Sequence, residues 1–289
     1  MNTAALVRRM AVALVLTGSS SMTMGQNIRP LAMGRESFRA AIEKRTRPYR
    51  DAVQLQGYEY VVPQLIIGGE WTSTIRLTNR GRNLVPPTDV YFLDNLGNPL
   101  PATFQITGGS IITDVGFSFS MDPGSLLELT FFGGSDTLFG HAFVACSAAG
   151  CGTPGIYGEV ALRNRNATRP DFESVFPLER PYAIQSMLFD GRNGMTTALY
   201  LVNENTFLSQ VTIDIVDTRN LILRSVNIQL SGLASQILTL HVIAPETTGI
   251  QGTLLIHGQN SDGVLITATG LRINPSNSFT PLRAFVLAP

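Results

Sequence analysis

The stretch WTSTIRLTN at residues 71–79 decides the fold, because the stretch MTTALYLVN at residues 195–203 repeats its plan. In both stretches apolar and polar side chains alternate, and both end in an asparagine, Asn79 and Asn203. A period of two, with threonines on one face, is typical of an antiparallel strand that buries its other face. We therefore predict two equivalent strands and, from their likeness, an internally duplicated chain.

The sequence beyond these two strands follows the same order in both halves. An apolar strand comes next and ends in an Asp-led turn, which begins at Asp94 in the first half and at Asp217 in the second. A glycine then opens another apolar strand, at Gly140 and at Gly252. The first half is longer, and its extra residues fall where we expect loops. Matched features in one order favour duplication over chance.

Length and turn chemistry predict the fold class. The chain has 289 residues, which suits two domains of ordinary size. Short apolar runs alternate with clusters of Gly, Pro, Asn and Asp, and many short strands at this spacing predict a sandwich or a barrel. We expect an all-β protein with two tandem immunoglobulin-like antiparallel β-sandwich domains, at 58–178 and 182–289. Among their strands we expect single ones over 110–120 and 235–243.

The first residues are typical of a secretory signal peptide. Arg8 and Arg9 precede a short apolar run, and we expect residues 1–25 to be removed so that Gln26 becomes the new N-terminus. The arginine pair also suits twin-arginine export, although the residues after it fit that signal poorly. The apolar run is too short to span a bilayer, and no later stretch reaches 18 uninterrupted apolar residues. We therefore expect an exported protein, periplasmic or at the cell surface, without a transmembrane segment in its mature part.

Charge is distributed unevenly along the chain. Residues 26–57 form a basic leader, whose good helix formers predict a helix over 35–47 that ends before Pro48. This leader is either a solvated linker or a basic arm that contacts an anionic surface. Residues 51–289 carry 12 basic and 19 acidic residues. Because nucleic-acid binding needs clustered Lys and Arg, this acidic body argues against a nucleic-acid partner.

Two cysteines, Cys146 and Cys151, are the only ones in the chain. An even pair in an exported protein favours a disulfide, which here would close a short loop between two strands. The alternative is a redox pair, but the spacing differs from the two-residue spacing of such motifs. We expect the structural bond.

Metal and catalytic motifs are missing from the sequence. His141, His241 and His257 fall in separate predicted strands and form no short-range ligand pair, so we interpret them as ordinary strand histidines. The best calcium candidate is the loop with Asp94, Asn95 and Asn98, although the same residue types also suit a tight hairpin. The hairpin is the favoured interpretation, and we expect neither a metal nor a cofactor.

Aromatic side chains are the strongest candidates for a binding surface. Phe117 and Phe119 share one face of a predicted strand, and an exposed pair would form a platform for stacking on sugars. If that face is buried, both rings belong to the core instead. Together with them, Trp71 and Tyr157 complete the set of candidate ligand-binding residues.

The plan of the chain resembles exported bacterial β-sandwich repeat proteins of unknown function. In these a T-T-x-L-x-L-x-N strand precedes a D-x-x-G-N-x-L hairpin, and an L-R-x-N-P-x-x-x-F stretch comes at the end. Residues 196–203, 94–100 and 271–279 match these three patterns. The resemblance covers about 58–289 and implies a fold, without catalytic residues to carry over. The first copy departs from it at 163–165, where Asn-Pro is expected.

Three functions remain open from the sequence. We expect a non-enzymatic module of the cell envelope or extracellular space that makes adhesive or structural contact, with envelope polysaccharide or another envelope protein as partner. The alternative is a carbohydrate-binding protein with an exposed aromatic face, which depends on the exposure of Phe117 and Phe119. A third hypothesis is an enzyme whose residues meet only in the folded chain. It would require a polar cleft between the domains that holds a histidine and carboxylates.

Overall fold

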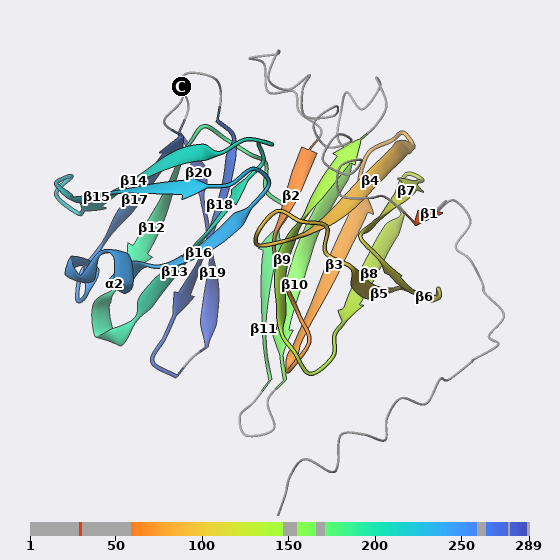
Figure 1. Ribbon diagram of the computed structural model, residues 1–289, viewed down its shortest axis with the longest axis horizontal. Helices are drawn as coiled ribbons and strands as arrows, with labels where there is room; N and C mark the ends of the chain where they lie inside the picture. The colour runs from red at the N-terminus through yellow and green to blue at the C-terminus, as the bar shows by residue number, and fades with distance from the viewer. Residues whose placement is uncertain are drawn as a thin grey trace, which may run out of the picture.

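The computed structural model describes residues 29–30, 59–146, 155–165, 171–258, 264–276 and 278–287. Within these ranges the chain is nearly all antiparallel strand and forms two side-by-side sandwiches (Figure 1). No helix in these ranges is long and apolar enough to cross a membrane. The expected signal peptide at 1–25 and the helix expected over 35–47 lie outside the described residues.

The first sandwich packs two sheets around an aromatic core. Sheet A contains, in spatial order, β1 (Arg29–Pro30), β7 (Gly116–Met121), β4 (Val85–Asp94), β9 (Leu138–Cys146) and β2 (Glu59–Ile67). Sheet B contains, in order, β11 (Phe172–Pro177), β10 (Ile156–Asn164), β3 (Trp71–Asn79), β8 (Leu126–Phe132), β5 (Ala102–Ile106) and β6 (Ile111–Asp114). Between them the buried rings of Phe92, Phe104, Phe117 and Phe131 contact one another.

The second sandwich has an aliphatic core. Sheet C contains, in order, β16 (Ser235–Thr239), β13 (Thr196–Asn203), β18 (Ile266–Ile273) and β19 (Phe279–Arg283). Sheet D contains, in order, β15 (Ile222–Leu230), β14 (Ser209–Asp217), β17 (Gln251–Gly258), β12 (Ile184–Asp190) and β20 (Phe285–Val286). Leu199 and Leu201 of β13 point into this core, where they meet Ile213 and Ile215 of β14. The described helical turns are η2 (Arg192–Gly194), α2 (Leu240–Ile243) and η3 (Pro245–Thr247).

The two sandwiches share one strand order. The order β7-β4-β9-β2 in sheet A corresponds to β15-β14-β17-β12 in sheet D, and β11-β10-β3-β8 in sheet B corresponds to β19-β18-β13-β16 in sheet C. The first sandwich adds β1 and the β5–β6 hairpin, and the second adds β20. The expected pair of antiparallel β-sandwiches is thus confirmed.

The shared strands differ in their pairing from a constant-type immunoglobulin domain. There the second strand lies between the first and the fifth, the fourth pairs with the fifth, and the sixth lies between the third and the seventh. Here the second shared strand (β3, β13) pairs with the fifth and the seventh, the sixth (β9, β17) pairs with the third and the first, and the fourth (β7, β15) pairs with the third. The second–fifth and third–sixth pairs are therefore retained, while the first, fourth and seventh strands lie in the opposite sheets.

Two of the expected strands were wrong in their extent. Residues 110–120 divide into β6 in sheet B and β7 in sheet A, because the chain crosses between the sheets at Val115. The strand expected over 235–243 ends at Thr239, and one helical turn, α2, follows it. That turn buries Leu240 in the second core and is followed by Pro245, which has no N–H to continue a strand ladder.

Asn79 shows why the repeated strand ends in asparagine. Its side chain is fully buried at the end of β3. Its Nδ2 donates to the carbonyl oxygens of Asn83 at 2.8 Å and Met121 at 3.0 Å, and its Oδ1 accepts from the Gly81 N–H at 2.9 Å. Since buried polar backbone groups must find partners, one side chain here satisfies three of them where the chain leaves sheet B.

A third hydrophobic cluster joins the two sandwiches. It combines the outer face of sheet A with the outer face of sheet C, on the sides of these sheets that point away from their own cores. Tyr91, Leu93 and Phe143 of the first sandwich pack here against Tyr200 and Val202 of the second. All five side chains are buried, so the junction excludes water.

Hydrogen bonds fix the register of this junction. The β4 hairpin of the first sandwich meets the start of β16, where the Ser235 N–H donates to the Asn95 carbonyl oxygen at 3.0 Å. The Tyr200 hydroxyl lies 2.8 Å from Ser235 Oγ and 3.0 Å from the Gly140 carbonyl oxygen. Asn95 Oδ1 accepts from Ser235 Oγ at 3.1 Å. Polar bonds that cross a buried interface restrict its geometry, because an unpaired partner there is costly.

Candidate functional site: a groove at the domain junction

Phe117 and Phe119 do not form a binding platform. Both are buried, with exposed fractions of 0% and 1%, and their rings lie in the core of the first sandwich. This corrects the hypothesis of a sugar-stacking face on that strand. The physical reason is that β7 turns this face toward sheet B, where other phenylalanine rings cover it.

The other two aromatic candidates have different surroundings. Trp71 stacks on Phe279 of the second sandwich with ring centroids 5.8 Å apart, so it contributes to the junction. Tyr157 is 55% exposed and lies in β10. Only Tyr157 of the four candidates therefore presents a largely exposed ring.

The loop considered for calcium is a hairpin in which Asp94 accepts hydrogen bonds from the turn itself. Asp94 Oδ1 accepts from the N–H groups of Leu96 and Asn98 at 2.9 and 2.8 Å, and Asp94 Oδ2 accepts from Asn98 Nδ2 at 3.1 Å. Asn95 points to the junction instead, as described above. Within the described ranges no three His, Cys, Asp or Glu side chains gather in a group that could hold a metal ion.

The three histidine candidates lie in different surroundings, and only one of the two cysteines is among the described residues. Cys146 ends β9, while Cys151 lies outside the described residues, so the expected disulfide stays a prediction. His141 is buried in the junction. His241 Nδ1 lies 2.7 Å from Thr196 Oγ1, and His257 Nε2 lies 3.1 Å from Asp214 Oδ2. Each histidine has a different neighbourhood.

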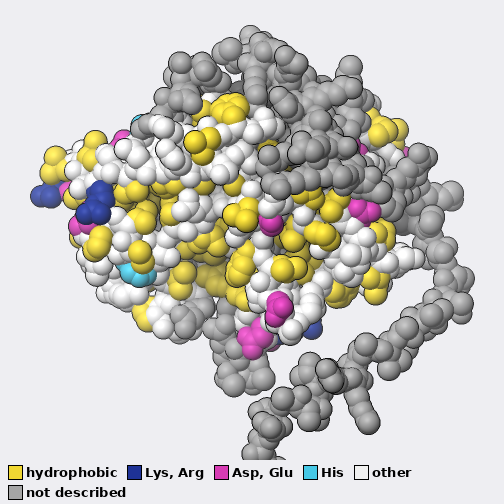
Figure 2. All heavy atoms as spheres, in the orientation of Figure 1, with side chains coloured by type: hydrophobic (Ala, Val, Ile, Leu, Met, Phe, Trp, Pro, Cys, Tyr) yellow, Lys and Arg dark blue, Asp and Glu magenta, His cyan; other side chains and the backbone are white. Residues whose placement is uncertain are grey.

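Exposed apolar side chains do not single out a site. Figure 2 shows hydrophobic side chains scattered over this face of both sandwiches, with few charged ones between them. The exposed apolar side chains of the described residues include Leu188 and Val242, with exposed fractions of 63% and 68%. Scattered exposed side chains of this kind are ordinary on folded proteins. In this molecule the charge and the shape of the surface distinguish a candidate site more clearly than its apolar side chains do.

A polar groove of about 640 Å³ lies beside the junction. Its walls come from the outer face of sheet B, from the connection 177–182 between the sandwiches, and from Tyr60 of β2 and Arg283 of β19. The volume is within the range of about 300–1,000 Å³ that is usual for ligand pockets. Since both sandwiches contribute residues, only the docked pair of domains forms the complete groove.

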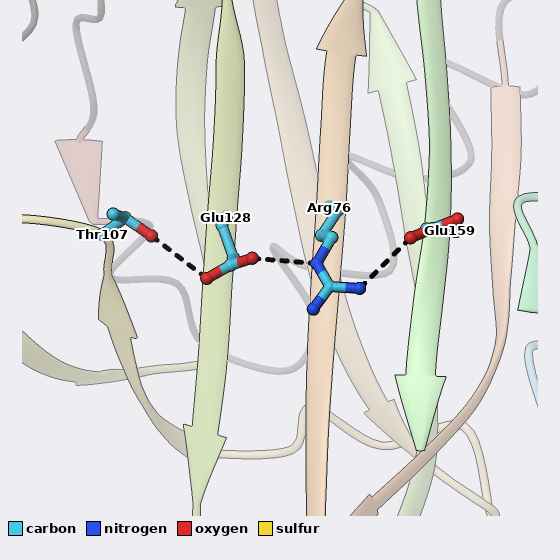
Figure 3. Close-up of polar contacts among 4 residues, drawn as sticks. All are labelled: Arg76, Thr107, Glu128 and Glu159. Carbon is cyan, nitrogen blue, oxygen red and sulfur yellow. Dashed lines mark hydrogen bonds and ion pairs between the residues drawn. The ribbon is translucent and has the colours of Figure 1, made fainter. Parts of the chain in front are cut away.

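Arg76 anchors one wall of the groove. Its guanidinium lies between two carboxylates on neighbouring strands, with Nε 2.8 Å from Glu128 Oε2 and Nη1 3.2 Å from Glu159 Oε1 (Figure 3). Thr107 Oγ1 donates to the far oxygen of Glu128 at 3.4 Å. The hydrogen bond to Glu128 is the main reason that the pKa of Arg76 is raised. This row of charges orders the side chains across β8, β3 and β10.

Two further arginines lie against tyrosine rings. The Arg80 guanidinium carbon is 5.1 Å from the centre of the Tyr157 ring, and that of Arg180 is 4.9 Å from the centre of the Tyr60 ring. Arg180 Nη2 also donates to the Tyr60 hydroxyl at 2.8 Å. Both are cation–π contacts, which hold an arginine in place without neutralising it.

Glu179 places a buried carboxyl group at the side of the groove. Its backbone pairs with Val61, with N–O distances of 2.7 and 3.0 Å, and only 7% of the residue is exposed. Arg283 Nε lies 3.2 Å from Glu179 Oε1, which is an ion-pair distance. The geometry does not meet the requirements of a hydrogen bond, so Oε1 accepts none from the described residues. Burial raises the pKa of Glu179 to about 7, and the Arg283 charge opposes this shift.

The sequence did not reveal the groove, because its residues come from six separate segments. Glu179 and Arg180 fall between the two expected domains, 58–178 and 182–289. One signal was present in the repeated strand, where Arg76 occupies the place that Tyr200 has in the second copy. At that place the second copy is covered by the first sandwich, whereas the first copy faces the groove.

A scan against protein-family models and searches of the curated proteins and of the solved structures gave no match. The groove therefore has to be interpreted from its own chemistry. Its lining combines guanidinium donors, carboxylate acceptors and tyrosine rings, which are the groups that hold a polar ligand. No histidine is among the described residues that line it.

Proposed function

We propose that this protein is a non-enzymatic module of the cell envelope or extracellular space, and that the junction groove is the surface through which it makes adhesive or structural contact. The groove itself carries the proposal, because it combines a volume of about 640 Å³ with arginines, carboxylates and an exposed tyrosine. The signal-like residues 1–25 support an envelope or extracellular location.

Carbohydrate binding is the second candidate, and Tyr157 favours it. The hypothesis now rests on an exposed tyrosine in the groove rather than on the buried Phe117 and Phe119. Aromatic rings with polar neighbours suit sugars, which offer an apolar ring face beside hydroxyl groups. Both candidate functions use the junction groove, and they differ in the partner that binds there.

The groove also bears on the hypothesis that the protein is an enzyme. Glu179 has a raised pKa, and perturbed carboxyl groups are common in catalytic clefts. Its neighbour Arg283 and its backbone pairing with Val61 equally suit a structural role at the junction. We therefore propose binding without turnover.

Co-sedimentation of the full chain with isolated cell envelopes and insoluble polysaccharides tests the proposal. We expect retention that is lost when Arg80 and Tyr157 are both changed to Ala. Arg219→Ala is the matched control, because Arg219 is an exposed arginine on the free hairpin of the second sandwich. Retention that is equal in all three proteins would move the contact surface elsewhere. Sugar release from the retained material that stops in Glu179→Gln would establish an enzyme instead.

A further inference from the structure

We infer that the junction groove binds an anionic polysaccharide whose sugar rings carry carboxylate groups. This inference rests on the proposed function, since it names the ligand class of the same groove. Three observations support it: the local charge, an arginine that has no ion-pair partner among the described residues and lies beside an exposed tyrosine, and the extent of the groove across both sandwiches.

Positive charge is concentrated in the groove. Among the described residues, four arginines and two carboxylates line it, and with Glu128, which pairs with Arg76 behind this lining, the local balance is still positive by one charge. The four are Arg76, Arg80, Arg180 and Arg283. A local positive potential on an otherwise acidic body attracts anions to that place and repels them from the rest of the surface. The ligand is therefore expected to be negatively charged.

Arg80 and Tyr157 together offer two groups that a carboxylated sugar can bind: a guanidinium group for the carboxylate and an aromatic ring for the sugar. Arg80 is exposed and makes no ion pair with the described part of the chain, and its guanidinium carbon lies 5.1 Å from the centre of the Tyr157 ring. This cation–π contact holds the guanidinium without neutralising its charge. A guanidinium group matches the two oxygens of a carboxylate, which favours carboxylate as the anion. Tyr157 is 55% exposed and offers its ring to the sugar that carries this group.

Glu179 Oε1 is buried and lies 3.2 Å from Arg283 Nε, so this ion pair holds the Arg283 guanidinium at the side of the groove.

The extent of the groove favours a polymer over a single sugar. It runs from Leu126 at the start of β8, past Tyr157, to Arg283 near the end of β19, so it crosses from the first sandwich to the second. Arg80 and Arg180 belong to different parts of its wall and contact different tyrosines. Repeated anionic rings can engage both places at once, which strengthens binding through multivalency.

Calorimetric titration of the full chain with two matched polymers tests this inference. The first is polygalacturonate, and the second is its methyl ester, which has the same backbone without the charge. Dextran sulfate serves as a third ligand, with charge but without carboxylate. We expect binding to polygalacturonate that is weakened about tenfold or more by Arg80→Ala and by Tyr157→Ala, in line with the loss of one charge-assisted contact. Arg219→Ala should bind as the unchanged protein does.

The outcomes separate the ligand class from the proposed function. Equal binding of polygalacturonate and its ester, lost in the groove variants, would overturn the anionic ligand and keep the groove as contact surface. Equal or tighter binding of dextran sulfate would overturn the preference for carboxylate. Binding of polygalacturonate that Arg80→Ala and Tyr157→Ala leave unchanged would overturn the inference about this site. If none of the three polymers binds while retention on envelopes still depends on the groove, the ligand class is rejected and the proposed function is kept.

Discussion

Asn79 and Asn203 hold equivalent positions in the two sandwiches and share three equivalent hydrogen bonds. Each ends the repeated strand opposite an isoleucine, Ile156 in the first sandwich and Ile266 in the second. Each side chain is fully buried, donates to the carbonyl oxygen four residues further on, and accepts from the N–H two residues further on. The asparagine at the end of the repeated strand therefore has a structural role in both copies.

Replacing Asn203 with Ala is expected to lower the free energy of unfolding by about 2–3 kcal/mol. The reason is that Nδ2 donates to the carbonyl oxygens of Phe207 and Leu230 at 2.9 and 3.0 Å, and both would lose this partner in a buried site. Urea denaturation measures the change. Asn83→Ala is the control, because Asn83 is exposed and its backbone carbonyl is kept. A change in Asn203→Ala no larger than in this control would contradict the account.

The junction is expected to show energetic coupling between Asn95 and Tyr200. Asn95 Oδ1 and the Tyr200 hydroxyl both contact Ser235 Oγ, at 3.1 and 2.8 Å. We expect Tyr200→Phe and Asn95→Ala to destabilise the protein by about 1–2 kcal/mol each and to be clearly non-additive in a double-mutant cycle. Thr218→Ala is the matched control, since Thr218 is exposed at the same place in the hairpin of the second sandwich. Full additivity of the junction pair would argue for domains that move independently.

Glu179 is expected to make stability depend on pH between about 4.5 and 7. Its folded-state pKa is raised to about 7, so in this window the folded protein holds a proton that the unfolded chain has released. Stability therefore falls as pH rises toward 7, by up to about 3 kcal/mol at 1.36 kcal/mol per pKa unit. Glu179→Gln removes this titration. Urea denaturation at pH 5 and pH 7.5 should show a smaller pH difference in the variant, and an identical difference in both proteins would count against the burial of this carboxyl group.

His141 is expected to weaken the junction at low pH. Burial lowers its pKa to about 3, while the Leu233 backbone and Asp94 oppose the shift. Neither ring nitrogen makes a hydrogen bond of good geometry with the described residues. The unfolded chain binds a proton below about pH 6.5 and the folded protein does not, so stability is lost as pH falls.

His141→Leu separates this titration from the packing at the junction. The variant should be as stable as the unchanged protein at pH 7, or about 1 kcal/mol more stable, because it removes two unpaired polar atoms from an apolar site. It should also lose less stability between pH 7 and pH 4.5 in thermal denaturation. A variant that is less stable at pH 7 and equally sensitive to acid would show that the histidine has a partner at the junction.

The repeated strand shows what sequence periodicity can predict and what it cannot. Alternation placed Ile75 and Leu77 inward, and both lie in the first core. The same alternation grouped Phe117 with Phe119 but did not say which face of their strand is covered, because that depends on sheet B. Trp71 shares the parity of Ile75, yet it lies at the start of β3, where Phe279 of the second sandwich stacks on it. Local pattern thus predicts strands and faces, while the covering element comes from the tertiary fold.

The groove lay beyond sequence reasoning for a related reason. Tyr60, Arg80, Glu179 and Arg283 are far apart in the chain. The folding of the first sandwich and its connection brings the first three together, and the packing of sheet A on sheet C adds Arg283. That packing depends on apolar side chains such as Tyr91, which alternate outward in a strand that is buried on both faces. A strand that is apolar on both faces is predicted to be buried on both, but the pattern does not indicate which element covers each face. The docking of the domains, and with it the groove, therefore required the structure.

Hydrogen exchange of the full chain, with and without soluble polysaccharide released from cell envelopes, shows whether the junction groove is the contact surface. We expect slower exchange on binding in residues 156–164 of β10 and in the connection 177–183, where the groove is lined, and no change in the β14–β15 hairpin. Protection that is confined to the β14–β15 hairpin or to the outer face of sheet D, with the groove segments unchanged in a bound sample, would contradict the assignment of the junction groove as the contact surface.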